Sequence, residues 1–318
     1  SDDKKTATLK TDGMKVGALQ LGLSAGKDLL GHEAETTWKL AVNLVFHLNI
    51  KTTALPEPAL VQIPNDPTAR DQSGLQAADL VYEYATEGGI TRFTAIFTHA
   101  PDKIGPVRSG RLISIKLTQH YRGVLFLSGT SAGTFQVLQQ SGIPAIFDTP
   151  GIMYRTTDRY PPNNLYTGAD AIARVMNGRP AVILPQGSPK LTSGGAPAVI
   201  SVPVHNSTYG YDVATGTFTK TEDGHQLADA AVGQPLHISM LIVMHTTVTT
   251  TGIVEDVNGA HGLDYDLSSG GKAELFYQGL QYAAHWNSPA KDQPLTFTTE
   301  SGQAIPLPQG LVWVDVVP

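Results

Sequence analysis

Two glutamates and three arginines with the potential for chemistry occur in the segment between residues 83 and 111. They are Glu83, Glu87, Arg92, Arg108 and Arg111. Arginine forms planar, bidentate contacts with carboxylates and phosphates, whereas glutamate can act as a general acid or base. These residue types predict either an anion-binding site or a site of acid–base chemistry.

The first part of this segment predicts a β-hairpin. Two runs rich in Val, Ile, Tyr, Phe and Thr flank the pair Gly88–Gly89, which supplies the positive φ that a two-residue loop needs. With such a loop we expect Arg92 to share a face with Glu83 and Glu87, because side chains alternate across a strand. The carboxylates would then either orient Arg92 toward a ligand or only pin the hairpin, at about 0.2–1 kcal/mol per cross-strand pair.

The second part predicts a helix over residues 106–121. Pro106 suits the first helical position, and apolar residues follow it at helical spacing. Arg108 and Arg111 would share a face of the opening turns, where free N–H groups and two guanidinium groups favour an anion. The alternative is a structural role in which both arginines pair with nearby acids.

The distribution of arginine supports a binding role. All nine arginines lie between Arg70 and Arg179, and the basic residues elsewhere are Lys or His. Polar loops in the same window, where functional groups often occur, supply further candidates that either contact the ligand or stabilise turns. These additional candidate ligand-binding residues are Asn65, Arg70, Ser128, Arg155, Arg159 and Asn164.

A G-x-S-x-G motif occurs at residues 129–133, between a predicted strand and a predicted helix. In esterase-like folds the central serine, here Ser131, is the nucleophile, and histidines do follow it in the chain. Those histidines fall in the β-rich part of the chain, however, and a glycine-rich turn can also simply bend the chain or hold an anion. The catalytic residues stay undetermined, with Glu83, Glu87 and Ser131 as candidates.

Bulk composition narrows the class of protein. The chain has 318 residues, a net charge of −6 and no cysteine, so it is long enough for two domains and lacks the basic field of a general nucleic-acid binder. The sequence contains no recognisable metal motif, and we expect neither a metal nor a cofactor. No apolar run reaches the ~18 residues of a membrane-spanning helix.

The order of predicted elements gives the fold class. Helices alternate with strands at first, which predicts an α/β domain with a mixed sheet at 59–184. A Pro/Gly-rich linker at 185–198 then leads to a β-rich antiparallel domain at 199–318. Residues 1–58 form a polar start and a segment that we leave unassigned.

Several segments also carry a family resemblance: IPNDPTARDQSGLQAADLVYEYATEGGITRF, IGPVRSGR, SGTSAGTFQVL, YRTTDRYPPNNLYT, AELFYQGLQYAAHWN and LTFTTESGQAIPLPQGLVWVDVV. They resemble the YerB-like lipoprotein family, a bacterial domain-of-unknown-function family, over about residues 60–318. The resemblance implies export across the membrane, an N-terminal α/β domain and a β-rich C-terminal domain, and it implies no established catalytic residue. The chain departs from the family pattern at Pro162, where we expect histidine.

Residues and resemblance together predict an extracytoplasmic bacterial protein, secreted or attached to the cell membrane by an N-terminal lipid anchor. We expect an arginine-rich cleft that binds an anionic or glycan ligand of the envelope. The first alternative is an envelope hydrolase acting on an ester, glycosidic or phosphodiester bond. The second is an assembly partner that binds another protein and no small ligand.

Overall fold

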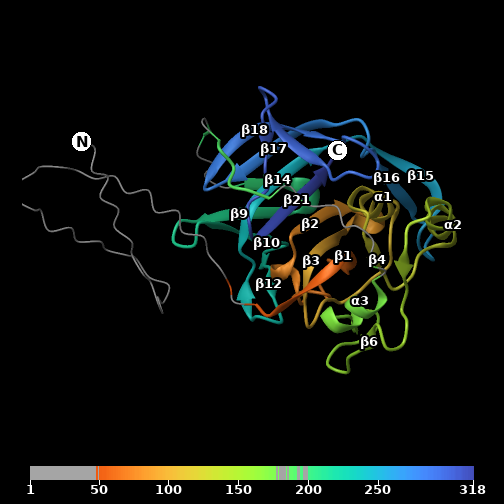
Figure 1. Cartoon of the computed structure of the whole chain (residues 1–318). Coiled ribbons are helices and arrows are strands. Elements are labelled where there is room, and N and C mark those ends of the chain that lie inside the picture. The colour runs from red at the N-terminus through yellow and green to blue at the C-terminus, as the bar shows by residue number, and fades with distance from the viewer. Residues whose placement is uncertain are drawn as a thin grey trace, which may run out of the picture.

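One mixed β-sheet extends through the described part of the chain (Figure 1). Of the expected N-terminal segment only its last residues are described, and part of the expected linker lies outside the described residues. No helix among the described residues is long and apolar enough to cross a membrane. The computed structural model describes residues 48, 50–176, 178, 184, 186–191, 194–195 and 200–318.

The last strand of the chain joins the two expected domains. This strand, β21 (Leu311–Val317), pairs in parallel with β2 (Leu80–Ala85) on one side and with β14 (Ile238–His245) on the other. All of its residues are buried, because it has a neighbour on each side and its sheet is covered on both faces. From β2 the sheet continues through β3 (Thr91–Pro101), β1 (Thr52–Pro64), β4 (Val124–Phe126) and β5 (Ala145–Ile146); from β14 it continues through β17 (Gly271–Tyr277), β18 (Leu280–Asn287), β19 (Thr296–Thr299) and β20 (Ala304–Ile305).

A smaller group of strands branches from the main sheet where β10 pairs with β14. Its apolar residues, such as Tyr209 and Phe218, pack in one core cluster with Phe93 and Trp313 of the main sheet. The strands of this group are β8 (Ile200–Val202), β9 (Ser207–Asp212), β10 (Thr217–Glu222) and β11 (His225–Gln226). Separate two-stranded pairs are β6 (Tyr154–Arg155) with β7 (Leu165–Tyr166), β12 (Ala228–Asp229) with β13 (Gln234–Pro235), and β15 (Val248–Val254) with β16 (His261–Tyr265).

The helices cover both faces of the N-terminal part of the sheet. Helix α1 (Leu112–Tyr121) contacts β1 and β4 on one face, whereas α3 (Ala169–Val175) contacts β1 and β3 on the other. Helix α2 (Ala132–Ser141) connects the parallel strands β4 and β5. Single 3-10 turns occur at Leu75–Ala77, Glu87–Gly89 and Pro203–His205. The predicted helices near 134–140 and 169–177 and the buried strand within 122–128 are therefore present, and the architecture confirms the predicted fold class.

The parallel strands of the sheet end at the same edge. β1 is parallel to β4, β4 to β5, and β2 to β21, while β1 and β2 are both antiparallel to β3. The carboxyl ends of β1, β2, β4, β5 and β21 therefore lie along one edge. In open α/β sheets this is the edge where ligands bind, and we refer to it as the carboxyl edge.

The hairpin formed by β2 and β3 differs from the prediction in its register. Tyr84 lies opposite Arg92, and Glu83 lies opposite Phe93. The connection holds three residues, Glu87–Gly89, closed by a hydrogen bond from the Thr86 N–H to the Ile90 carbonyl. One additional loop residue shifts the pairing by one position and moves the side chains to the other face, so the expected common face for Arg92 and Glu83 was wrong.

The predicted helix start at Pro106 was also wrong, because α1 begins at Leu112. The backbone before α1 forms hydrogen bonds to neighbouring strands instead. The Val107 N–H donates to the Leu165 carbonyl, and the Arg108 N–H donates to the Gln62 carbonyl. Because these N–H groups bond to other strands, residues 107–108 stay extended and do not join the helix. Arg108 therefore precedes the helix and Arg111 is its N-cap residue.

Candidate functional site

Arg92 lies at the carboxyl edge and is 4% exposed. Its Nη1 donates to the Ser109 carbonyl at 2.7 Å, but its buried Nε has no hydrogen-bond partner. Arg92 forms no ion pair with a carboxylate anywhere in the described ranges. Burial, followed by the charge of Arg111, lowers the pKa of Arg92 to about 10, which reflects the free-energy penalty of a buried cation without a counter-ion.

Arg108 belongs to the extended segment before α1. It lies close enough to Arg92, on β3, for its charge to act on that guanidinium group. Its backbone N–H donates to Gln62 at the end of β1, and its carbonyl accepts from the Ser128 N–H just after β4. Its side chain is half-buried, and its Nε is without a partner. Burial lowers the pKa of Arg108, although the nearby Asp66 opposes this shift.

Arg111, by contrast, is fully engaged. Its Nε donates to Glu87 at 2.8 Å and its Nη2 contacts the other oxygen of the same carboxylate, while its Nη1 donates to the Gly110 carbonyl. Glu255 Oε2 lies 3.6 Å from Arg111 Nε, and the opposite oxygen accepts from the Thr134 hydroxyl. Burial alone would lower the pKa of Arg111, but the bond to Glu87 raises it overall.

The remaining wall of this site is the turn that precedes α2. The Gly110 N–H donates to the Gly129 carbonyl, which sets this turn against the arginine segment. Ser128 and Ser131 are partly exposed, and a Cβ on Gly129 would meet no atom within 4 Å, so the turn borders open space. The Ser131 hydroxyl accepts the Thr134 N–H at 3.2 Å and caps the helix.

We call Glu87, Arg92, Arg108, Arg111 and Glu255 the arginine site. Three guanidinium groups and two carboxylates leave it with one net positive charge. Glu87 and Glu255 both contact Arg111. Arg92 and Arg108 therefore keep N–H donors that no carboxylate uses.

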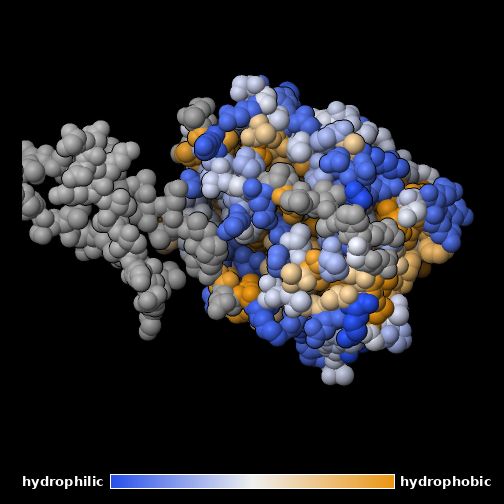
Figure 2. Space-filling view, viewed as in Figure 1, coloured by the Kyte–Doolittle hydropathy of each residue, from blue (hydrophilic) through white to orange (hydrophobic). Residues whose placement is uncertain are grey.

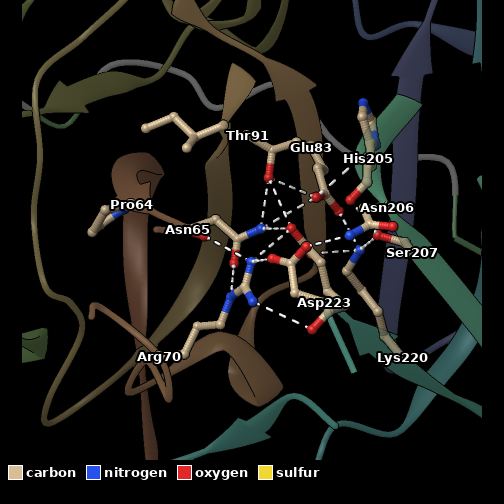
Figure 3. Close-up of polar contacts among 12 residues, drawn as sticks. Pro64, Asn65, Arg70, Glu83, Thr91, His205, Asn206, Ser207, Lys220 and Asp223 are labelled. Atoms are coloured by element: carbon tan, nitrogen blue, oxygen red, sulfur yellow. Dashed lines mark hydrogen bonds and ion pairs between the residues drawn. The ribbon is translucent and has the colours of Figure 1, made fainter. Parts of the chain in front are cut away.

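A second cluster, fully buried, surrounds Glu83 (Figure 3). Its carboxylate contacts Lys220 Nζ at 2.8 Å and accepts from Trp313 Nε1 at 3.0 Å and from the Thr91 hydroxyl at 2.8 Å. Lys220 has no exposed surface and also contacts Glu222 at 2.9 Å. Burial alone would lower the pKa of Lys220, but Glu83 and the other acids around it raise it.

Residues of the loop after β1 reach this cluster as well. Arg70 Nη2 contacts Glu222 at 2.9 Å and Asp223 at 2.8 Å, and its Nε donates to Asn65 at 3.1 Å. Asn65 donates to Glu222 at 2.6 Å. Burial and the charge of Glu83 raise the pKa of Glu222. Asn65 and Arg70 thus connect β1 to β10, and their side chains bond to residues other than Arg92 and Arg108.

His205 and Asp315 complete the buried cluster. His205 Nδ1 lies 2.9 Å from Asp315, whose other oxygen accepts from the Tyr209 hydroxyl at 2.7 Å. Ligand atoms of Glu83, His205 and Asp315 lie within 4.8 Å of one another, a spacing that could hold a metal ion. The ammonium of Lys220 already provides a cation against Glu83, so we assign no metal to these residues.

The three other loop candidates contact each other or the backbone. Arg159 donates to the carbonyls of Ala69 and Asp71 at 2.6 and 2.7 Å. Arg155 donates to Asn164 at 2.9 Å and pairs with Asp148 at 2.5 Å. These contacts fix the 154–166 loop and give its arginines partners, whereas Arg92 and Arg108 each keep an Nε without a partner.

Sequence reasoning missed the residues that the C-terminal half contributes. Glu255 follows β15, and Lys220, Glu222 and Asp315 come from β10 and β21. Only Asp315 carried a readable signal, because a lone carboxylate inside the apolar run LVWVDVV implies a buried partner. The sequence of β10, TFTKTE, contains no similar pattern that would indicate that Lys220 is buried.

Comparison with known proteins identifies the family. Residues 48–182 match the model described as "Protein of unknown function (DUF3048) N-terminal domain", and residues 199–314 match its C-terminal domain. The chain is 31% identical over 283 residues to "Putative lipoprotein YerB" of Bacillus subtilis, covering 82% of this chain and 81% of that protein. The chain belongs to the DUF3048 family.

The structure of a family member supports the same conclusion. The crystal structure of YerB from Bacillus subtilis matches with a TM-score of 0.68 and 26% identity, over 82% of this chain and 91% of that one. The resemblance expected from the hairpin and GPVRSGR segments is therefore confirmed. The family description names no activity, so the function of this DUF3048 protein has to be argued from its own residues.

Proposed function

We propose that this protein binds one anionic group of a cell-envelope component at its arginine site. The observation that carries the proposal is the pair Arg92 and Arg108, two neighbouring cations with buried, unpartnered Nε atoms and no carboxylate in ion-pair contact. An uncompensated buried charge destabilises a fold unless something pairs with it. A bound anion supplies that counter-charge and uses the free donors.

The charge of the arginine site favours a monoanion. Glu87 and Glu255, both in contact with Arg111, offset two of the three positive charges of the arginine site, so one singly charged group completes the balance. A phosphodiester or a carboxylate fits this requirement, and both suit the bidentate geometry of arginine. The turn at 128–131 adds polar groups beside the arginines, and the N-terminus of α2 favours negative charge there.

Binding is favoured over hydrolysis by the positions of the catalytic candidates. Glu83 is completely buried and bonded to Lys220 and Trp313, so a substrate cannot approach it in this conformation. Ser131 uses its hydroxyl as a helix cap. The likeness to a protein named as a lipoprotein supports an extracytoplasmic, membrane-attached location, which gives the site access to envelope polymers.

The decisive experiment measures anion binding and stability in the same variants. Isothermal titration with a glycerol phosphodiester, glycerol 3-phosphate and N-acetylmuramic acid tests the ligand class. Arg108→Ala is expected to abolish binding without loss of stability, within about 0.5 kcal/mol, because no ion pair of Arg108 occurs among the described residues, its Nε has no partner, and burial disfavours its charge. Arg122→Asn is the matched control, since that exposed arginine follows the C-terminal end of α1 in a left-handed conformation that asparagine tolerates.

A thermal-shift assay provides a second measurement. A ligand at 100 times its Kd should raise the unfolding free energy of the wild type by about 2.7 kcal/mol and leave that of Arg108→Ala unchanged. Equal binding by the wild type and Arg108→Ala would refute the site. Loss of several kcal/mol of stability in Arg108→Ala would show that this arginine is structural.

A further inference from the structure

A cavity lies at the opposite edge of the sheet from the arginine site. Its volume is about 340 Å³, and Lys51 and Asp102 form part of its rim. These residues flank Thr52 and Pro101, which pair where β1 begins and β3 ends, whereas the arginine site lies where β1 ends. The cavity is at the small end of the range for ligand pockets, about 300–1,000 Å³.

One wall of the cavity is an aromatic platform. Tyr154 is 47% exposed, and its ring stacks on Tyr166 with centroids 6.2 Å apart and an interplanar angle of 29°. Tyr166 is buried, and Lys103 Nζ lies 4.4 Å from the centroid of its ring. Tyr154 is therefore supported from behind by a fixed ring, and Ile152 and Met153 line the cavity beside it.

The rim carries equal numbers of acids and bases. Lys51 pairs with Asp102 at 3.3 Å, with both side chains largely exposed. Asp170 and Arg174 lie one helical turn apart on α3, and Arg174 also donates to the Gly151 carbonyl at 2.9 Å. Two carboxylates and two cations give no net charge, and the surface around β6 and α3 is largely hydrophilic in Figure 2.

We propose that this cavity is a binding subsite for a neutral sugar ring. The C–H face of a pyranose packs against an aromatic ring, because its weakly positive hydrogens meet the negative π face. Its hydroxyls donate to Asp102 and Asp170 and accept from Lys51 and Arg174. An anion would meet two carboxylates at the rim, and an apolar ligand would bury four charged groups without partners.

Saturation-transfer NMR with maltotriose and tri-N-acetylchitotriose tests the subsite. In the wild type we expect transfer concentrated on ring C–H protons. Tyr154→Ala should weaken the affinity by about tenfold, whereas Tyr154→Phe, which keeps the platform, should bind like the wild type. Because Tyr154 is half exposed, both variants should keep the wild-type melting temperature.

Arg108→Ala is the control, since it removes the proposed anion site at the other edge and leaves this cavity intact. Retained sugar binding in Arg108→Ala separates the two proposals. Absence of transfer to either trisaccharide at millimolar concentration, or equal binding by Tyr154→Ala and the wild type, would overturn the sugar subsite whatever the result at the arginine site.

Discussion

Replacing Lys220 with methionine tests whether the buried cluster holds the two halves of the chain together. Lys220 Nζ lies 2.8 Å from Glu83 and 2.9 Å from Glu222, and all three residues are almost without exposed surface. Methionine fills much of the space of the lysine stem, so the loss falls on the charge rather than on packing. Glu222 keeps its contact with Arg70 at 2.9 Å, whereas Glu83 loses its closest cation.

The expected loss of unfolding free energy in Lys220→Met is about 3–5 kcal/mol, the usual effect of removing one partner of a buried ion pair. A charge pair at 4 Å and an effective dielectric constant of about 20 gives a similar value, about 4 kcal/mol. Urea denaturation followed by circular dichroism and tryptophan fluorescence measures it. Fluorescence is a local probe, because Lys220 Nζ lies 5.4 Å from the ring centroid of Trp313.

Two second-site changes and the pH dependence sharpen the test. Glu83→Gln should recover most of the loss in Lys220→Met, and Glu222→Gln should recover less, because Glu222 retains Arg70. In Lys220→Met one of the two facing carboxylates takes up a proton on folding, so stability should fall as pH rises above about 4.3. A loss below about 1 kcal/mol at pH 7.5, or equal rescue by both changes, would refute the reasoning.

Three further predictions concern single residues. Burial alone would lower the pKa of His205, but its bond to Asp315 raises it; its stabilisation is therefore present below about pH 6.5 and lost above it. In urea denaturation at pH 6 to 9, His205→Asn should flatten this decline, and an unchanged slope would contradict it. Glu255→Gln should raise the net charge of the arginine site and favour dianionic glycerol 3-phosphate over a phosphodiester by about tenfold, measured by titration; an unchanged preference would refute the charge count. Ser131→Ala should lose about 1 kcal/mol as a helix cap while Ser131→Asp stays stable, and a loss above about 3 kcal/mol in urea denaturation would indicate another role.

Local sequence patterns predicted much of the fold. Apolar spacing placed α2, α3 and the buried strand near Val124, because these elements are set mainly by side-chain periodicity and turn residues. The composition of the hairpin strands also located β2 and β3. The concentration of arginine singled out Arg92 and Arg108, which the structure places together at the carboxyl edge, and their binding role stays a prediction.

The errors arose where a single residue or a distant partner decides the geometry. One additional loop residue at Glu87–Gly89 moved Glu83 to the face opposite Arg92. The start of α1 depended on whether the Arg108 N–H bonds within a helix or to Gln62. Both alternatives satisfy the local sequence, so neither could be excluded before the neighbouring strands were placed.

The sequence by itself determined the family, the order of the elements and the arginine-rich window, because these follow from residue identity and short-range spacing. Tertiary structure alone decided which charges meet. It brought Glu255 to Arg111 and Lys220 to Glu83 across more than a hundred positions of the chain, while Arg92 and Arg108 have no carboxylate in ion-pair contact among the described residues. Such pairings depend on which strands are neighbours in the sheet, and β21, the last strand, fixes that order by pairing with both halves.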